Sequence, residues 1–207
     1  MPQQQADPVR IYETATSQAR NVIQGVRPEQ MKQSTPCSEW DVEALINHLV
    51  GAQTGIAGMV SGSQVAAGST PLETLDAAVS AMVAAGKAPG GLEKKVQGRQ
   101  GEVPAGQMLN IGTMDVAIHT WDLAKATGQD KTLDSRVVEH IFQTVEGMVQ
   151  RGPSPAFAAP TETPANASRQ DKMIALTGPR AVAWPWLGEG TAVWRARAAA
   201  KCVSRSA

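Results

Sequence analysis

The 207-residue chain has few of the features that mark secreted, disulfide-rich or nucleic-acid-binding proteins. Its two cysteines, Cys37 and Cys202, are too few for a disulfide scaffold and form no C-x-x-C pair. The 19 basic and 19 acidic side chains cancel, so no net field attracts nucleic acid or an anionic membrane surface. We therefore expect small-molecule partners, with neither nucleic acid nor a membrane among them.

Long apolar segments are also missing. No run approaches the roughly 18 apolar residues that a membrane span needs, and the polar start MPQQQADPVR lacks the apolar stretch of a secretion signal. These two absences predict a cytoplasmic protein. With 42% hydrophobic residues, the chain still has enough apolar material for one large core.

Capping residues followed by apolar residues at helical spacing divide most of the chain into expected helices. They run from Asp7-Pro8 to a stop at Pro28, from about residue 39 to 60 after a Ser38/Asp41 capping box, from Thr70-Pro71 to Gly86, from about 107 to 127, from Asp134 to Gly152-Pro153, and over about 168 to 176. Residues 92–106 suggest a loose hairpin or an ordered loop, and residues 152–167 an irregular crossing.

Little strand signal and no internal repeat accompany these helices, so the sequence predicts an all-α helical bundle. We expect residues 1–178 to form one domain. Residues 179–207 are rich in tryptophan, arginine and alanine. They are predicted to be either a packed appendage or an irregular, mobile tail.

The fourth expected helix places three ionisable groups on an apolar stripe. At about 100° per residue, Asp115, His119 and Asp122 fall within about 60° of one another, beside apolar residues such as Ile118. Buried charges are normally paired, neutralised or bound to a metal. Because Asp115 and His119 are one helical turn apart, both side chains can converge on one ion.

His48 supplies a third ligand from the second expected helix, where it sits beside Leu45 and Leu49 on the inward face. Two histidines and one carboxylate suit Zn²⁺, Ni²⁺ or Fe²⁺ and leave coordination positions open, as in catalytic sites. Such an ion can acidify bound water or a thiol. Two alternatives stay open, namely hydrogen-bonded core histidines without a metal and pairing of Asp115 with an arginine.

Two further side chains near this set have both a structural and a functional interpretation. Asp122 could orient His119 by accepting a hydrogen bond from the ring nitrogen that does not face the metal, or pair with Lys125 or Arg136. Cys37 precedes a helix N-terminus, which would lower its pKa and make it reactive, but a buried, inert turn cysteine is the simpler interpretation.

Other candidates are assigned to structure. Trp40 and Trp121 are expected to point away from the stripe and to pack between elements. His140 lies about 130° from the centre of its helix's apolar face, so we expect it to be solvent-exposed and not a ligand. A glycine row beside His48 either opens space for a substrate or permits close helix packing; it consists of Gly51, Gly55 and Gly58.

Two segments carry a resemblance to a known family, TPCSEWDVEALINHLVG at 35–51 and DVAIHTWDLAKATGQD at 115–130. They resemble the DinB-like metalloprotein superfamily, in its actinobacterial branch related to mycothiol-dependent maleylpyruvate isomerase. The resemblance covers about residues 8–178. It implies a DinB-like four-helix bundle, here with an additional short C-terminal helix, and a metal held by His48, Asp115 and His119. The characterised isomerase has Glu at the place of Asp115, and many DinB-like proteins have His.

The resemblance also implies a reaction class, because characterised members attach or use low-molecular-weight thiols. The leading hypothesis is a divalent-metal-dependent enzyme, with zinc or nickel, that uses mycothiol or another such thiol as an S-transferase or isomerase. A noncatalytic metal-binding or ligand-sensing bundle is the alternative, and a helical interaction module without metal is a third. A homodimer is compatible with the sequence.

Overall fold

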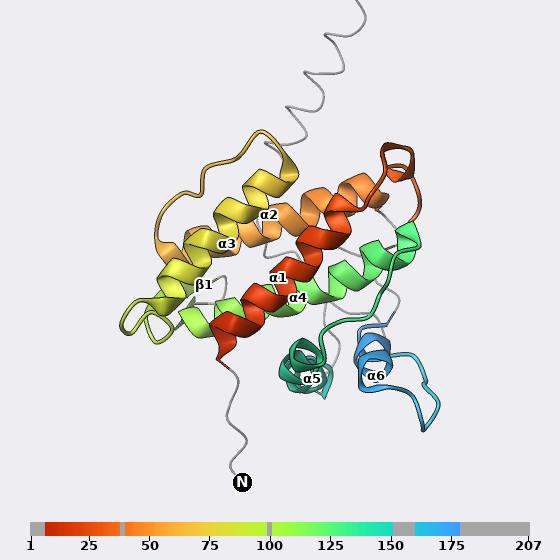
Figure 1. Cartoon of the computed structure of the whole chain (residues 1–207). Helices are drawn as coiled ribbons and strands as arrows, with labels where there is room; N and C mark the ends of the chain where they lie inside the picture. Colours follow the sequence, from red (N-terminus) through yellow and green to blue (C-terminus); the bar gives the residue numbers. More distant parts are fainter. Residues whose placement is uncertain (1–6, 38–39, 99–100, 151–159, 179–207) are drawn as a thin grey trace, which may run out of the picture.

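The computed structural model describes residues 7–37, 40–98, 101–150 and 160–178, and this part of the chain is mainly helical (Figure 1). The α-helices are α1 Pro8–Gln24, α2 Val42–Ser61, α3 Pro71–Lys87, α4 Ala105–Thr127, α5 Ser135–Gln150 and α6 Arg169–Leu176. A short 3₁₀ helix, η1 Pro28–Gln30, follows α1. The predicted all-α class is confirmed. The predicted tail of residues 179–207 lies outside the described residues.

Side-chain caps fix most helix starts where the sequence predicts them. The Asp7 carboxylate accepts a hydrogen bond from the Val9 amide at the start of α1. Thr70 and Glu73 form a capping box at α3, and Ser168 caps α6. Each such cap stabilises its helix by about 1 kcal/mol, because it pairs an amide that the helix itself leaves unbonded.

The start of α2 differs from the prediction. The helix begins at Val42, and its N-cap is Asp41, whose carboxylate accepts from the Ala44 amide at 2.8 Å. The predicted start near residue 39 is therefore too early, since Asp41 takes the capping role that the capping box gave to position 38. Residues 38–39 themselves lie outside the described part of the chain.

The weak signal at residues 92–106 corresponds to a small hairpin. Strand β1, Lys95–Gly98, pairs antiparallel with β2, Gly101–Pro104, and Val96 faces Val103 across the ladder. The hairpin contacts α2 through β1 and α4 through β2. It leads directly into α4, so it helps to set where that helix begins.

Helices α1 to α4 form a four-helix core. Helix α1 packs against α3 and α4, and α2 packs against the same two helices from the other side. Helices α5 and α6 pack on each other, and α5 also contacts α1 and α4; in Figure 1 this pair is seen almost end on, below the core. No helix within the described ranges is long and apolar enough to cross a membrane.

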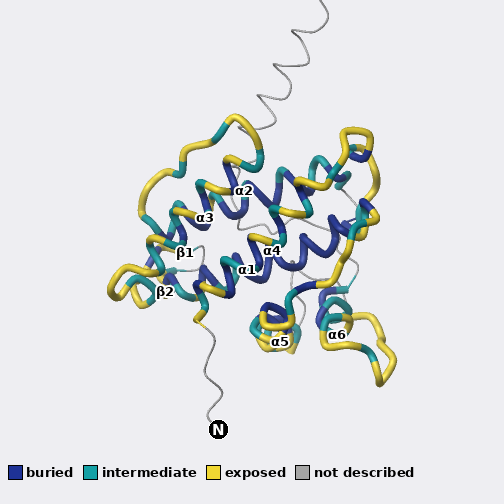
Figure 2. The backbone as a smooth tube through the Cα atoms, in the orientation of Figure 1, coloured by how far each residue is buried: buried dark blue, intermediate teal, exposed yellow. Residues whose placement is uncertain are grey.

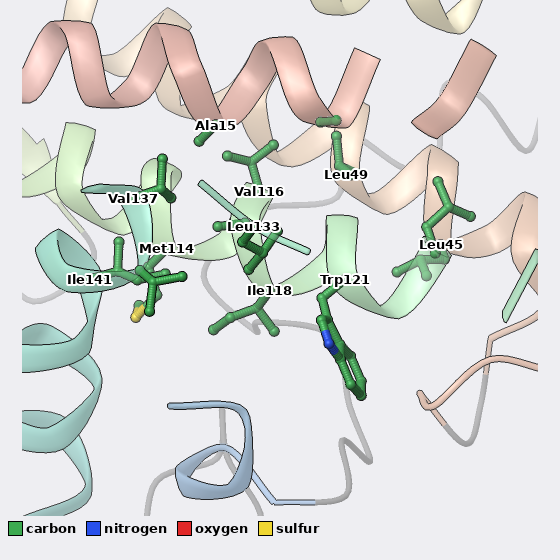
Figure 3. Packing of buried hydrophobic residues seen from close by; sticks show 14 of the residues in the cluster. Ala15, Leu45, Leu49, Met114, Val116, Ile118, Trp121, Leu133, Val137 and Ile141 are labelled. Carbon is green, nitrogen blue, oxygen red and sulfur yellow. The ribbon is translucent and has the colours of Figure 1, made fainter. Parts of the chain in front are cut away.

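Helix α4 is the central element of the bundle. Its residues are buried without interruption from Gly112 to Ala124, and its tube is dark along most of its length in Figure 2. Figure 3 shows part of the surrounding core, with Leu45 and Leu49 from α2 and Ile118 and Trp121 from α4. Because α4 is surrounded by other helices, its polar side chains must find partners inside the protein.

Candidate metal centre

The structure brings the three predicted ligands together between α2 and α4. His48, Asp115 and His119 are 5%, 0% and 2% exposed. Nε2 of His48 lies 3.3 Å from Oδ1 of Asp115, and Nε2 of His119 lies 3.6 Å from the same oxygen. One ligand atom from each of the three residues lies within 4.8 Å of the others. The side chains therefore converge on one small volume.

The donor set fits a small divalent ion in spacing and in chemistry. Ligand bonds of about 2.0–2.2 Å in tetrahedral geometry place neighbouring ligand atoms about 3.3–3.6 Å apart, which matches the two distances to Oδ1 of Asp115. Nε2 of His119 is buried and has no hydrogen-bond partner among the described residues. An unsatisfied buried nitrogen is costly unless something binds it, and coordination would satisfy it.

Asp122 explains how the ring of His119 is oriented. Its Oδ2 lies 3.1 Å from Nδ1 of His119, and Asp122 is fully buried. A carboxylate accepts, so Nδ1 carries a hydrogen, and Nε2 is the ring nitrogen left to bind either a proton or a metal ion on the side of Asp115. Arg136 instead pairs with Asp134, which removes one of the alternative partners that the sequence left open for Asp122. The arrangement matches the carboxylate–histidine pairs found behind metal ligands.

The surrounding charges also perturb His119 in the metal-free protein. Burial lowers its pKa, but the hydrogen bonds to Asp122 and Cys37 and the charges of Asp115 and Asp122 outweigh burial and raise the pKa to about 10. A proton and a cation therefore compete for the same buried nitrogen, because both are favoured by the two neighbouring carboxylates.

The second oxygen of Asp115 is held by residues that the sequence analysis missed. Nε2 of Gln53 donates to Oδ2 of Asp115 and to the Gly112 carbonyl, each at 3.3 Å. The Tyr12 hydroxyl donates to Oε1 of Gln53 at 3.0 Å. Burial, and then the charge of Asp115, raises the pKa of Tyr12. Gln53 could have been found, because a polar residue there interrupts the apolar face of α2 between Leu49 and Ile56.

Trp40 corrects a prediction, because it does not point away from the site. Its ring centroid lies 4.4 Å from that of His48 and 5.8 Å from that of His119. The loop before α2 places it there, with the Thr35 hydroxyl donating to the Trp40 carbonyl at 2.8 Å. Helical phasing does not give the direction of Trp40, because this residue precedes α2.

Cys37 is buried, as the simpler interpretation predicted, and it touches the site. Its Sγ lies 3.6 Å from Oδ2 of Asp122 and 3.9 Å from Nδ1 of His119. These three side chains form a second group with metal-ligating atoms close together. This group uses the nitrogen of His119 that already bonds Asp122, whereas the group with His48 uses the unpartnered nitrogen. The group with His48 is therefore the better candidate for a metal position.

Comparison with known proteins identifies the family. The sequence profile of the mycothiol maleylpyruvate isomerase N-terminal domain matches residues 12–124, more than half of the chain. The chain belongs to this family. The matched region contains His48, Asp115, His119 and Asp122, and the resemblance to the DinB-like superfamily seen in the sequence is thereby confirmed.

Two relatives match a larger part of the chain than the family profile does. Uncharacterized proteins from two strains of Mycobacterium tuberculosis, H37Rv and CDC 1551 / Oshkosh, are each 31% identical to the chain over 182 residues. The alignments cover 83% of this chain and 97% of each relative. No solved structure gives a significant match to the chain.

The glycine row on α2 shows both alternatives that the sequence allows, open space at two positions and closer packing at the third. No described atom lies within 4 Å of an ideal Cβ at Gly51 or Gly55, so these two border open space. At Gly58 a Cβ would meet the Ser63 carbonyl at 3.5 Å. Gly51 and Gly55 follow His48 at spacings of three and seven, which places all three on one face of α2.

The remaining candidates keep structural roles, with one correction. Trp121 is buried in the core, as predicted, with Nζ of Lys125 lying 4.8 Å from its ring centroid. His140 is not fully exposed but half-buried, and its Nε2 lies 3.0 Å from Oδ1 of Asn110 on α4. Burial lowers its pKa. His140 belongs to neither group of metal-ligating residues in the described part of the chain.

Proposed function

We propose that this protein is a divalent-metal-dependent enzyme of the S-transferase or isomerase type that uses a low-molecular-weight thiol. The observation that carries the proposal is the buried set of His48, Asp115 and His119, with the unpartnered Nε2 of His119 turned toward the other two. Membership of a family named for a mycothiol-dependent isomerase supports the thiol.

In this proposal the three residues hold one zinc or nickel ion, and other residues prepare their surroundings. Three protein ligands leave room for a further ligand on the ion. A bound divalent ion lowers the pKa of a thiol, so that thiolate is present at neutral pH. Asp122 orients the His119 ring so that Nε2 is left for the ion, and the Trp40 ring lies against His48.

The substrate is proposed to approach along the face of α2 that carries His48. Gly51 and Gly55 lack side chains there, and no described atom fills the space above them. Mycothiol is the first candidate for the thiol, because the family is named for it. A thiol cosubstrate also fits a cytoplasmic protein, since thiols are kept reduced in that compartment.

Two reaction types agree with this site, and they differ in what happens to the thiol. A transferase forms a carbon–sulfur bond to an electrophile and loses a leaving group, so one thiol is consumed for each product. An isomerase adds the thiolate to an activated carbon–carbon double bond and expels it after rotation about that bond, so the thiol is recovered. In the transferase reaction the proton lost from the thiol leaves with the leaving group or passes to solvent. In the isomerase reaction it returns to the released thiolate.

The test is turnover of metal-loaded protein with mycothiol and a panel of electrophiles that includes maleylpyruvate. Free thiol and substrate absorbance are followed together, which separates consumption from recovery. We expect turnover in the wild type and in His140→Ala, whose histidine lies outside the site, and its loss in His119→Ala. Metal binding without turnover of any substrate in the panel, or unchanged turnover in His119→Ala, would overturn the enzymatic proposal. The first result would leave a metal-binding or sensing protein.

A further inference from the structure

A polar layer crosses the bundle between two hydrophobic clusters. One cluster holds Leu45 and Leu49 of α2, and the other holds Ile56 of the same helix. Along α2 the two clusters are separated by Gln53. On α4 the same division falls at Gly112, and Tyr12 of α1, a member of the second cluster, reaches Gln53 with its hydroxyl. The layer links three of the four core helices through hydrogen bonds.

The direction of each hydrogen bond in this layer is determined by chemistry. The Gly112 carbonyl can only accept, so the amide nitrogen of Gln53 must face it. The same nitrogen then donates to Oδ2 of Asp115 with its other hydrogen. Oε1 of Gln53 can only accept, and the Tyr12 hydroxyl therefore donates to it. All hydrogen-bonding groups of the Gln53 amide are engaged except one lone pair of its oxygen.

This arrangement divides the two oxygens of Asp115 between two tasks. Oδ2 accepts a hydrogen bond from Nε2 of Gln53 and is thereby occupied. Oδ1 is the oxygen that lies toward both histidines. An aspartate is short, and a freely rotating carboxylate in this place could present both oxygens to a cation and fill one more coordination position.

We propose that Gln53, supported by Tyr12, is a positioning residue that makes Asp115 a ligand through Oδ1 alone. This inference rests on the proposed metal site. Its consequence is a coordination position kept open for the thiol or substrate. Gly112 contributes by its lack of a side chain, since a Cβ there would lie 3.2 Å from Oε1 of Gln53.

The test compares chelator-stripped wild type, Gln53→Met and Tyr12→Phe in titrations with Co²⁺, whose visible spectrum reports coordination number. Methionine keeps the length and helical preference of glutamine but cannot donate to Asp115. We expect Gln53→Met to bind Co²⁺ 10–100-fold more weakly, the range typical for partners behind metal ligands, with a weaker visible absorption than the wild type. Tyr12→Phe should shift both readouts in the same direction by less.

Gln30→Met is the matched control. Gln30 is also buried, and its amide donates to the Thr127 carbonyl at 2.9 Å and accepts from the Arg27 amide at 3.0 Å. At 1.5 Å per residue, Thr127 lies about 18 Å along α4 from Asp115. This variant should lose stability while keeping the affinity and spectrum of the wild type. Equal effects of Gln53→Met and Gln30→Met on Co²⁺ would overturn the proposal.

A second measurement separates the Gln53 role from failure of the metal site itself. In the metal-free protein, Gln53→Met and Asp115→Ala are combined in a double-mutant cycle of thermal unfolding. We expect the double variant to lose less thermal stability than the sum of the single losses, because either change alone breaks the same hydrogen bond. Additive losses of stability would contradict a Gln53–Asp115 hydrogen bond. Failure of the wild type to bind Co²⁺ would instead overturn the metal centre, and with it the ligand role of Asp115.

Discussion

Nδ1 of His119 lies 3.1 Å from Oδ2 of Asp122, while Nε2 of the same ring has no hydrogen-bond partner in the described part of the chain. The buried carboxylate on one side of the imidazole thus determines which nitrogen is left for a ligand on the other side. Both residues are on α4, three positions apart, so a single helical turn sets this relationship.

The first prediction follows from this tautomer. In Asp122→Asn the side-chain amide can donate to Nδ1, which would move the ring hydrogen to Nε2 and block the nitrogen that faces Asp115. We expect a 10–100-fold loss of Zn²⁺ affinity with little change in the helical circular dichroism spectrum. A competition titration measures it, and unchanged affinity would show that Asp122 does not control the ring.

The second prediction concerns pH. Without metal, the pKa of His119 is raised to about 10 from an unfolded value of about 6.5. The folded state therefore binds more protons than the unfolded state between these values, so this group's contribution to stability is fully present below about pH 6.5 and is lost as pH rises toward 10. Metal must displace that proton.

Zn²⁺ affinity should consequently increase between pH 6.5 and 8.5, by up to about tenfold per unit for one displaced proton. Competition titrations at three pH values measure how Zn²⁺ affinity changes with pH. Proton release into a weak buffer on adding Zn²⁺ shows whether a displaced proton causes this change. His140→Ala should keep the slope, because that ring lies outside the site. An affinity that does not change with pH would contradict the assignment of His119 as a ligand.

The fold could be predicted from the sequence to the extent that caps and apolar spacing encode it. The starts at Asp7, Thr70 and Ser168 are local signals, and the structure confirms them. The start of α2 is less determined, because Asp41 and the residue at position 38 are both capping types and only the chain's path selects between them. The sequence signal for the hairpin is weak because each strand has only four residues.

The sequence predicts which three side chains lie together at the site but not what surrounds them. His48 stands out among leucines on the apolar face of α2, a local pattern. Helix α4 is buried on nearly every side, so its phase alone carries little information about which residues face α2. Trp40 reaches His48 from a loop, and Tyr12 reaches Gln53 from another helix. Such contacts depend on tertiary packing, which periodicity does not describe.

The third prediction uses a pair of glycines with opposite surroundings. Gly55→Ala should stabilise the protein by about 0.5–1 kcal/mol, because alanine favours a helix and its Cβ meets no described atom within 4 Å. Gly112→Ala should destabilise it by about 1–2 kcal/mol, since the Cβ would press on Gln53, which three hydrogen bonds hold in place. Chemical denaturation measures both, and equal effects would contradict the packing described for α2 and α4.

The fourth prediction concerns Cys37. The thiol is buried against Asp122 and His119, so it should react with a thiol reagent far more slowly in the folded protein than after denaturation. Cys37→Ala should lose about 1 kcal/mol of stability and keep one bound metal per chain. Loss of the metal in this variant would favour the group of Cys37, His119 and Asp122 as the metal position.

The central claim, a metal ion held by His48, Asp115 and His119, is tested most directly with the three histidines of the chain. Chelator-stripped wild type, His48→Ala, His119→Ala and His140→Ala are each titrated with Co²⁺, and visible absorption is recorded. We predict one ion per chain with matching spectra in the wild type and His140→Ala, and loss of tight binding in the other two variants. Stoichiometric binding with an unchanged spectrum in His48→Ala or His119→Ala would contradict this account.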